Sequence, residues 1–263
     1  METGLRDRVA VVAAASKGLG RAAADALADE GAKLVICARH GAEIQRAARE
    51  IADRTGAAVV AEVADVSLAG DIDRLVARAV EVFGGVDVLV TNAGGPKAGP
   101  FTAVTDDDWH AGVELTLMSA VRLSRAVIPS MRARGGGRII HITSVSVKQP
   151  IENLVLSNSL RAAVVGMSKT LATELAPDGI TVNCVAPGYT LTERVAELNE
   201  YVAAREGRPV AEIDARLLRS IPAGRYGEPR ELAAVITFLA SAPAAYLTGT
   251  TIAVDGGYVR GVM

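Results

Sequence analysis

Short runs rich in Val, Ile and Ala alternate with longer amphipathic stretches along the chain. This alternation is typical of a parallel sheet whose two faces are covered by helices. The apolar runs predict strands at Val9–Ala14, Lys33–Cys37, Ala57–Glu62, Val86–Thr91, Arg138–Thr143, Thr181–Ala186 and Thr251–Val254. The amphipathic stretches predict helices at Gly18–Glu30, Ala42–Thr55, Leu68–Phe83, Asp106–Arg134, Asn153–Ala176 and Pro229–Ala240, and Pro129 predicts a kink or a break in the fourth of them. The expected fold class is therefore α/β, with a doubly wound, seven-stranded parallel sheet flanked by helices.

The length of the chain fits one large domain. At 263 residues and 27.2 kDa it can bury a sizeable core. No repeat, low-complexity tract or linker divides it, so we expect a single domain over residues 1–263. The stretch Leu191–Ser220 is charged and helix-prone, and it interrupts the alternation. It has two interpretations, a solvated helical pair or a helical lid at 191–220 over a substrate bound beyond the strand ends.

Composition argues against several classes of function. A formal net charge of −2 and a pI near 6.0 give no basic surface for nucleic acid. No apolar run approaches the ~18 residues of a membrane span. The N-terminal segment has no signal-peptide apolar core, so a soluble, cytoplasmic protein is expected. The two cysteines fall in predicted buried strands and the three histidines are scattered, so we expect structural thiols and no metal site.

The loop after the first predicted strand suits a dinucleotide. It reads Ala13-Ala14-Ala15-Ser16-Lys17-Gly18-Leu19-Gly20 and opens a predicted helix. A pyrophosphate needs close approach to backbone N–H groups at a helix N-terminus, and glycine at positions 18 and 20 allows that approach. The strand–loop–helix context distinguishes this loop from an ordinary helix start that happens to contain glycine. The loop therefore predicts a cofactor site.

The residues after the second predicted strand indicate which dinucleotide binds. An acidic residue about 20 positions beyond the glycines would bind the ribose 2′-hydroxyl of NAD. The chain has Cys37-Ala38-Arg39 there, without a carboxylate. Lys17 and Arg39 supply two cations that suit a 2′-phosphate, so we expect NADP(H) to be preferred over NAD(H).

Further segments extend the pattern along the whole chain, namely Asp65-Val66, Asn92-Ala93-Gly94-Gly95, Pro187-Gly188-Tyr189-Thr190 and Val254-Asp255-Gly256-Gly257. Together with the stretch Ser157-Asn-Ser-Leu-Arg161, they resemble the short-chain dehydrogenases/reductases, and most of all the 3-oxoacyl-(acyl-carrier-protein) reductases. Ala13 and Ala14 depart from the family, which has Thr and Gly there. The resemblance implies a Rossmann fold, a homotetramer or homodimer, and a cofactor site built from Ala14, Ser16, Lys17, Gly18, Leu19, Gly20, Arg39, Asp65, Val66, Asn92, Ala93, Gly94, Arg161, Pro187, Gly188 and Thr190.

The resemblance also implies four catalytic positions, of which three are changed. In the family a serine binds the substrate carbonyl, a tyrosine transfers the proton, a lysine lowers the pKa of that tyrosine, and an asparagine supports a water relay. Ser144 matches the serine, whereas the other positions hold Thr116, Ser157 and Arg161. An aliphatic hydroxyl is a far weaker acid than a phenol of pKa ~10, and a planar guanidinium does not reproduce a compact ammonium. Other groups that could donate the proton are Tyr189, Glu152 and Asn158, and Tyr189 can also be a packing residue.

Three functions remain open at this point. The first is an NADP(H)-dependent oxidoreductase that reduces a ketone or oxidises a secondary alcohol, with a small-molecule carbonyl or alcohol as substrate and an unusual proton donor. The second is a cofactor-binding protein without redox turnover. The third is a lyase, isomerase or cyclase on the same fold, using Ser144 and Tyr189 for proton transfer only. We favour the first, because Ser144 and the expected nicotinamide site are retained.

Overall fold

The computed structural model describes residues 2–262 and contains one parallel sheet of seven strands in the order β3-β2-β1-β4-β5-β6-β7. The strands are β1 (Val9–Val12), β2 (Lys33–Ala38), β3 (Val59–Val63), β4 (Val88–Thr91), β5 (Gly137–Ile142), β6 (Ile180–Pro187) and β7 (Thr251–Val254). The predicted fold class is confirmed. Strand order reverses between β1 and β4, and open parallel sheets bind ligands in the crevice beyond the carboxyl ends of the strands at such a point.

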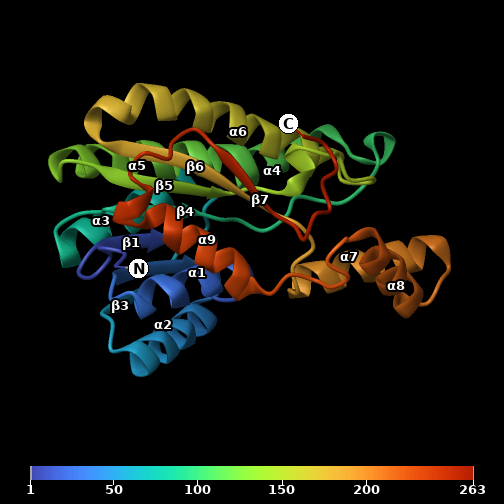
Figure 1. Cartoon of the computed structure of the whole chain (residues 1–263), viewed down its shortest axis with the longest axis horizontal. Coiled ribbons are helices and arrows are strands. Elements are labelled where there is room, and N and C mark those ends of the chain that lie inside the picture. Colours follow the sequence, from blue (N-terminus) through green and yellow to red (C-terminus); the bar gives the residue numbers. More distant parts are fainter. Residues whose placement is uncertain (1, 263) are drawn as a thin grey trace.

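Helices cover both faces of the sheet (Figure 1). One face carries α1 (Gly18–Asp29), α2 (Gly41–Thr55) and α9 (Pro229–Ala240), and the other carries α3 (Ala69–Phe83), α5 (Ser119–Ala133) and α6 (Val155–Leu175). Alternate residues of one strand enter the two cores, because side chains in a strand point to opposite faces. In β1, Ala10 and Val12 pack under α1, whereas Val9 and Val11 pack on the α3 side.

The predicted helix Asp106–Arg134 is a continuous helical stretch of three parts. Helix α4 (Asp106–Gly112) begins with a capping box in which Thr105 and Asp108 bond each other's backbone N–H groups. A π-helical segment, η2 (Val113–Met118), then leads into α5. The break that Pro129 could have caused is absent, because α5 runs through this residue to Ala133. The irregularity lies at η2 instead, and π-turns of this kind are frequent at functional sites.

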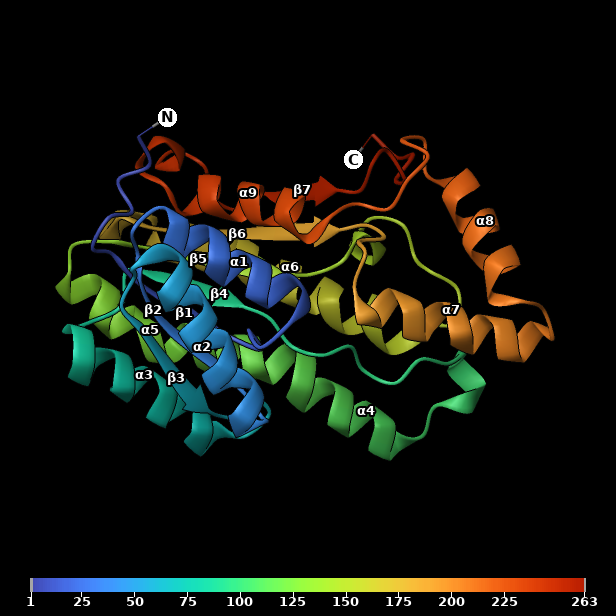
Figure 2. The ribbon, with the colours of Figure 1, turned by 90° about the horizontal axis from the view of Figure 1, so that it is seen from below.

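The stretch Leu191–Ser220 forms two helices, α7 (Glu193–Glu206) and α8 (Val210–Ser220), as its sequence predicts. Figures 1 and 2 show this pair extending beyond one end of the sheet, at the end of β6. The remaining short helical turns are η1 (Phe101–Ala103), η3 (Val145–Val147), η4 (Ala176–Asp178) and η5 (Ala242–Ala244).

The two cysteines lie in the core, as expected. Cys37 in β2 and Cys184 in β6 are buried and unbridged, and burial raises the pKa of the Cys37 thiol to about 12. None of the helices within residues 2–262 combines the length and apolar character needed to cross a membrane.

Candidate active site

The loop between β1 and α1 is folded tightly against the neighbouring strands. The Ala13 amide donates to the carbonyl oxygen of Val90 in β4 (3.0 Å), and the Ala15 amide donates to that of Cys37 in β2 (2.9 Å). Gly18 has φ +60°, a left-handed conformation that glycine adopts without strain. A Cβ on Gly20 would lie 2.3 Å from the carbonyl oxygen of Ala14. The two glycines that predicted the site are therefore required by the shape of the loop.

The start of α1 is open to an anion. Lys17 occupies the N-cap position in extended conformation, and no side chain within the described part of the chain caps the helix start there. The first N–H groups of a helix have no partner within it and carry the positive end of the helix dipole. This end suits a phosphate group, so the residues present fit the pyrophosphate of a dinucleotide.

Asn92 connects the end of β4 to the same loop. Its Nδ2 donates to the carbonyl oxygen of Ala14 (3.2 Å), which holds the β4 end beside the start of α1. Ala93 and Gly94 follow directly, so the predicted cofactor residues of the first and fourth strands share one edge of the sheet.

The ends of β2 and β3 complete that edge. Arg39 follows β2 and is exposed. Asp65 follows β3, and its Oδ1 accepts bonds from the amide (2.9 Å) and the hydroxyl (2.7 Å) of Ser67. This turn fixes the position of Val66 at the end of the sheet.

Helix α7 closes over the loop. Lys17 forms an ion pair with Glu193 in the first turn of α7. The next residue, Arg194, donates from Nη2 to the carbonyl oxygen of Pro96 (3.2 Å), and a Cβ on Gly95 would lie 2.8 Å from its Nε. The start of α7 thus touches the loops after both β1 and β4.

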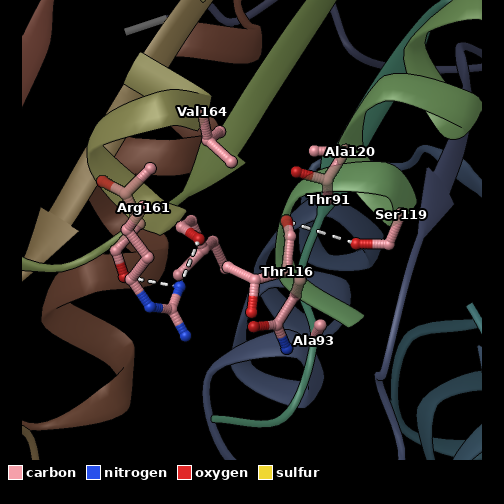
Figure 3. A pocket seen from close by; sticks show the side chains of 10 residues that line it. Thr91, Ala93, Thr116, Ser119, Ala120, Arg161 and Val164 are labelled. Carbon is pink, nitrogen blue, oxygen red and sulfur yellow. Dashed lines mark hydrogen bonds between the residues drawn. The ribbon is translucent and has the colours of Figure 1, made fainter. Parts of the chain in front are cut away.

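A small cavity is lined by two of the predicted catalytic residues, Thr116 and Arg161 (Figure 3). Its volume of about 20 Å³ can hold about one water molecule. Its lining residues come from β4, η2, α5, β5 and α6, and they are Thr91, Asn92, Ala93, Thr116, Ser119, Ala120, Ile142, Thr143, Arg161 and Val164. The Thr116 hydroxyl is buried and has no hydrogen-bond partner among residues 2–262, so a water in the cavity would satisfy it.

Arg161 is anchored at the end of β5. Its Nη1 donates to the carbonyl oxygens of Ile142 (3.2 Å) and Thr143 (3.0 Å), and its Nε donates to Oγ of Ser157 one turn earlier in α6 (3.2 Å). Burial, together with nearby Arg194, lowers the pKa of Arg161 to about 10. The guanidinium therefore stays positively charged at neutral pH, with its position fixed by three hydrogen bonds.

Ser144 and Ser157 both have an oxygen that accepts a hydrogen bond from the protein. The Ser146 amide donates to Oγ of Ser144 (3.1 Å) at the start of η3, and Arg161 donates to Oγ of Ser157. A hydroxyl that accepts a bond keeps its own proton to donate. Both serines can therefore donate to an oxygen atom of a substrate.

The Pro187–Thr190 segment lies at the end of β6. The Gly188 amide donates to the carbonyl oxygen of Val254 in β7 (2.9 Å), and Thr190 is buried. The Tyr189 ring meets the Tyr258 ring edge-on, with 5.1 Å between centroids. Burial and the neighbouring Tyr258 raise the pKa of the Tyr189 phenol, which makes it a weaker acid.

The structure brings Asn92, Ala93, Thr116 and Arg161 together around the cavity, while Ser144, Ser157 and Tyr189 do not line it. The sequence did not predict two residues of the site, Thr91 and Arg194. Thr91 lines the cavity, and its hydroxyl forms a hydrogen bond with Nδ1 of buried His141 at the paired position of β5 (2.7 Å). Arg194 was not singled out, although a cation just after the Pro187–Thr190 segment was a usable signal.

Three comparisons identify similar proteins. A family model described as enoyl-(acyl carrier protein) reductase matches residues 13–259. The 3-oxoacyl-(acyl-carrier-protein) reductase of Synechocystis sp. is 38% identical over 259 residues, covering 98% of this chain and 99% of the relative. The crystal structure of L-sorbose reductase from Gluconobacter frateurii, complexed with NADPH and L-sorbose, is 36% identical and covers 100% of both chains with a TM-score of 0.95.

A third similar protein was solved with NADPH bound. The NADPH-bound short-chain oxidoreductase of Pseudomonas aeruginosa PAO1 is described as containing an atypical catalytic centre. It is 32% identical, covers 97% of this chain and 98% of its own, and superimposes with a TM-score of 0.88.

Proposed function

Because the chain belongs to the short-chain dehydrogenase/reductase family, we propose that it is an NADP(H)-dependent oxidoreductase that reduces a ketone or oxidises a secondary alcohol. The observation that carries the proposal is the cradle formed by the loop after β1, the open start of α1 and Asn92. When bound there, a nicotinamide dinucleotide supplies the hydride, and the protein supplies position and charge. The residues assigned to holding it are Ala14, Ser16, Lys17, Gly18, Leu19, Gly20, Arg39, Asp65, Val66, Asn92, Ala93, Gly94, Arg161, Pro187, Gly188 and Thr190.

Two cations support the phosphorylated form of the cofactor. Arg39 is exposed after β2, and the chain has no carboxylate at the neighbouring positions 37 and 38. Lys17 is paired with Glu193 of α7, and a 2′-phosphate would compete with that carboxylate. The L-sorbose reductase and the Pseudomonas oxidoreductase were both solved with NADPH, which agrees with this choice.

Ser144 is assigned to orienting the substrate. It lies directly beyond β5, and its oxygen already accepts from the Ser146 amide. Its hydroxyl proton can therefore be donated to the carbonyl oxygen of a substrate. Negative charge that develops on that oxygen strengthens the bond, which favours the transition state over the ground state.

Ser157 and Arg161 are assigned together as the proton donor. A serine alone is too weak an acid for this role. Arg161 stays charged and donates to Oγ of Ser157, so it stabilises negative charge on that oxygen as the proton leaves. The cavity beside Arg161 and Thr116 can hold a water that bonds the Thr116 hydroxyl. Tyr189 is assigned to packing instead, because its ring meets that of Tyr258 edge-on at the end of β6.

A second function, cofactor binding without turnover, is favoured by one observation. The position of the expected phenol holds Ser157, and the position of its activating ammonium holds Arg161. Loss of a positioned general acid typically lowers a rate by ~10²–10⁴, so turnover could fall to a negligible level while the cradle still binds the cofactor.

We also assign α7 and α8 to a lid, since the start of α7 contacts the loops after β1 and β4.

The decisive experiment measures NADPH binding by fluorescence and NADPH consumption by absorbance, with a broad panel of ketones and, in reverse, secondary alcohols. We expect tight binding and consumption with at least one ketone. Ser157→Ala should lower kcat by about 10²–10⁴ without changing NADPH affinity, whereas Ser159→Ala, on the exposed side of the same helix, should behave as wild type.

Each other outcome points elsewhere. Binding without consumption across the panel would support the second function. Product formation without net consumption would indicate a lyase, isomerase or cyclase. Full activity of Ser157→Ala would remove that serine from the mechanism and leave the donor to another group.

A further inference from the structure

A second cavity lies at the opposite edge of the sheet from the candidate active site. Its volume is about 200 Å³. Its walls are the segment Gly4–Leu5, the first residues of β4 and β5, the loop Gly135–Gly137 and the end of α9. Figure 2 places the N-terminus at the end of the molecule away from α7 and α8. A ligand here would therefore be separate from the cofactor cradle.

The lining of this cavity has an excess of positive charge. Three guanidinium groups, those of Arg8, Arg134 and Arg138, face one carboxylate among the described lining residues, that of Asp87. The carboxylate is already engaged. Arg134 donates to both of its oxygens at 2.8 Å, Arg8 donates at 3.1 Å, and the Val9 amide donates at 2.8 Å. Asp87 therefore has little capacity left to neutralise a third cation.

Arg138 is that third cation. Its Nη1 donates only to carbonyl oxygens, those of Gly137 (2.9 Å) and Gly179 (3.4 Å). Its Nε is buried and has no partner within residues 2–262. Burial, and the nearby charge of Arg8, lower the pKa of Arg138. A half-buried charge without an acidic partner is unfavourable, because buried charges are normally paired.

We propose that this cavity binds a phosphate-sized oxyanion, held by Arg138 and Arg8. A guanidinium matches the planar, bidentate geometry of phosphate oxygens, and among the described residues the terminal nitrogens of Arg138 bond only backbone carbonyls and no carboxylate. The cavity is smaller than the roughly 300–1,000 Å³ of sites for drug-sized ligands, so it suits a free ion or one phosphate group of a larger molecule. The loop N–H groups of Gly135 and Gly136 are already bonded to Arg132 and Met131, which leaves recognition to the arginines.

Calorimetric titration and thermal unfolding with inorganic phosphate test this site, with sodium chloride at equal ionic strength as the reference. The cofactor cradle is a competing anion site, so the titration is repeated on Lys17→Met. We expect phosphate to bind wild type and Lys17→Met alike and to raise Tm in both. Arg138→Met should weaken binding by about 10–100-fold, the loss expected for hydrogen bonds to a charged group. Arg132→Met is the matched control, since Arg132 pairs with Asp178 outside the cavity lining.

The outcomes separate the alternatives. A phosphate effect that survives Arg138→Met, or disappears with Lys17→Met, would overturn the proposal. Equal Tm changes in phosphate and chloride would also overturn it. The same holds if Arg138→Met lowers the stability by the same amount with and without phosphate, since a purely structural arginine would behave in this way. O-phosphoserine distinguishes the source of the ligand. Tighter binding of this monoester identifies one phosphate group of a larger molecule, and tighter binding of inorganic phosphate identifies the free ion.

Discussion

Replacing Gly20 with alanine tests whether the loop after β1 is a close-fitting cradle. An added Cβ would lie 2.3 Å from the carbonyl oxygen of Ala14 and 2.8 Å from Nδ2 of Asn92. A backbone oxygen cannot rotate away, so the loop or the start of α1 must shift. Overpacking of this kind costs about 1–3 kcal/mol, whereas alanine in place of a helical glycine returns about 0.5–1 kcal/mol. We therefore expect a net loss of about 0–2.5 kcal/mol in the free energy of unfolding.

Gly166 in α6 provides the matched control. It is helical and exposed, and apart from the neighbouring backbone of its own helix no heavy atom of the described residues lies within 4 Å of an added Cβ. Gly166→Ala should therefore raise the free energy of unfolding by about 0.5–1 kcal/mol. Since the gain in helix propensity is common to both variants, they should differ by the clash alone, about 1–3 kcal/mol. Urea denaturation followed by circular dichroism measures both values.

The same shift should disturb cofactor binding. It moves the first N–H groups of α1 and strains the bond from Asn92 to Ala14, so Gly20→Ala should weaken NADPH binding by about tenfold or more, equivalent to ~1.4 kcal/mol. Fluorescence titration should find unchanged affinity for Gly166→Ala. If Gly20→Ala were as stable as Gly166→Ala and bound NADPH equally well, the cradle would not have the shape described.

Charge, pH and thiol reactivity give three further predictions. Lys17→Met and Arg39→Asp should each weaken NADPH binding by about tenfold or more with little effect on NADH, and equal losses for both cofactors in titrations would contradict the assignment. Asp87→Asn should lower the free energy of unfolding at neutral pH by about 1.5–3 kcal/mol, the value of bonds to a charged group. Burial raises the pKa of Asp87, but its guanidinium and amide bonds outweigh this and lower it. The contribution of the Asp87 carboxylate to the free energy of unfolding is therefore complete above the ordinary aspartate pKa of about 3.9 and is lost as the pH falls through the lower folded-state value. The stabilities of wild type and Asp87→Asn should thus converge in acid denaturation. A stability difference that stays constant with pH would refute this. Cys37 and Cys184 are buried, and burial raises the pKa of Cys37 to about 12. A thiol reagent should therefore label both cysteines only as the protein unfolds in denaturant. Rapid labelling of the native protein would contradict this and show that β2 or β6 opens.

Local patterns predicted most of the secondary structure because they depend on neighbours along the chain. The apolar runs became the seven strands and the amphipathic stretches became helices, with ends displaced by one or two residues. Pro129 was the exception. A proline in a helix costs about 3 kcal/mol in isolation, but α5 buries Leu123, Val127 and Met131 against the sheet and α3. Packing of this face holds the helix through the proline, and no property of the local sequence reports it.

Residue type and spacing in the sequence predicted the loop after β1 as a dinucleotide site, and the resemblance to the family indicated that Ser157 and Arg161 stand where a tyrosine and a lysine are expected. Contacts between distant segments determined the rest. The carbonyl of Thr143, just beyond β5, holds Arg161 in place, and α7 places Glu193 and Arg194 over the loops after β1 and β4. The π-helical segment η2 places Thr116 in the wall of the small cavity. The excess of cations around Asp87 arises in the same way, from arginines up to 79 positions away from it in the sequence. Such arrangements depend on which surfaces meet when the sheet and helices pack, and a one-dimensional pattern does not contain that information.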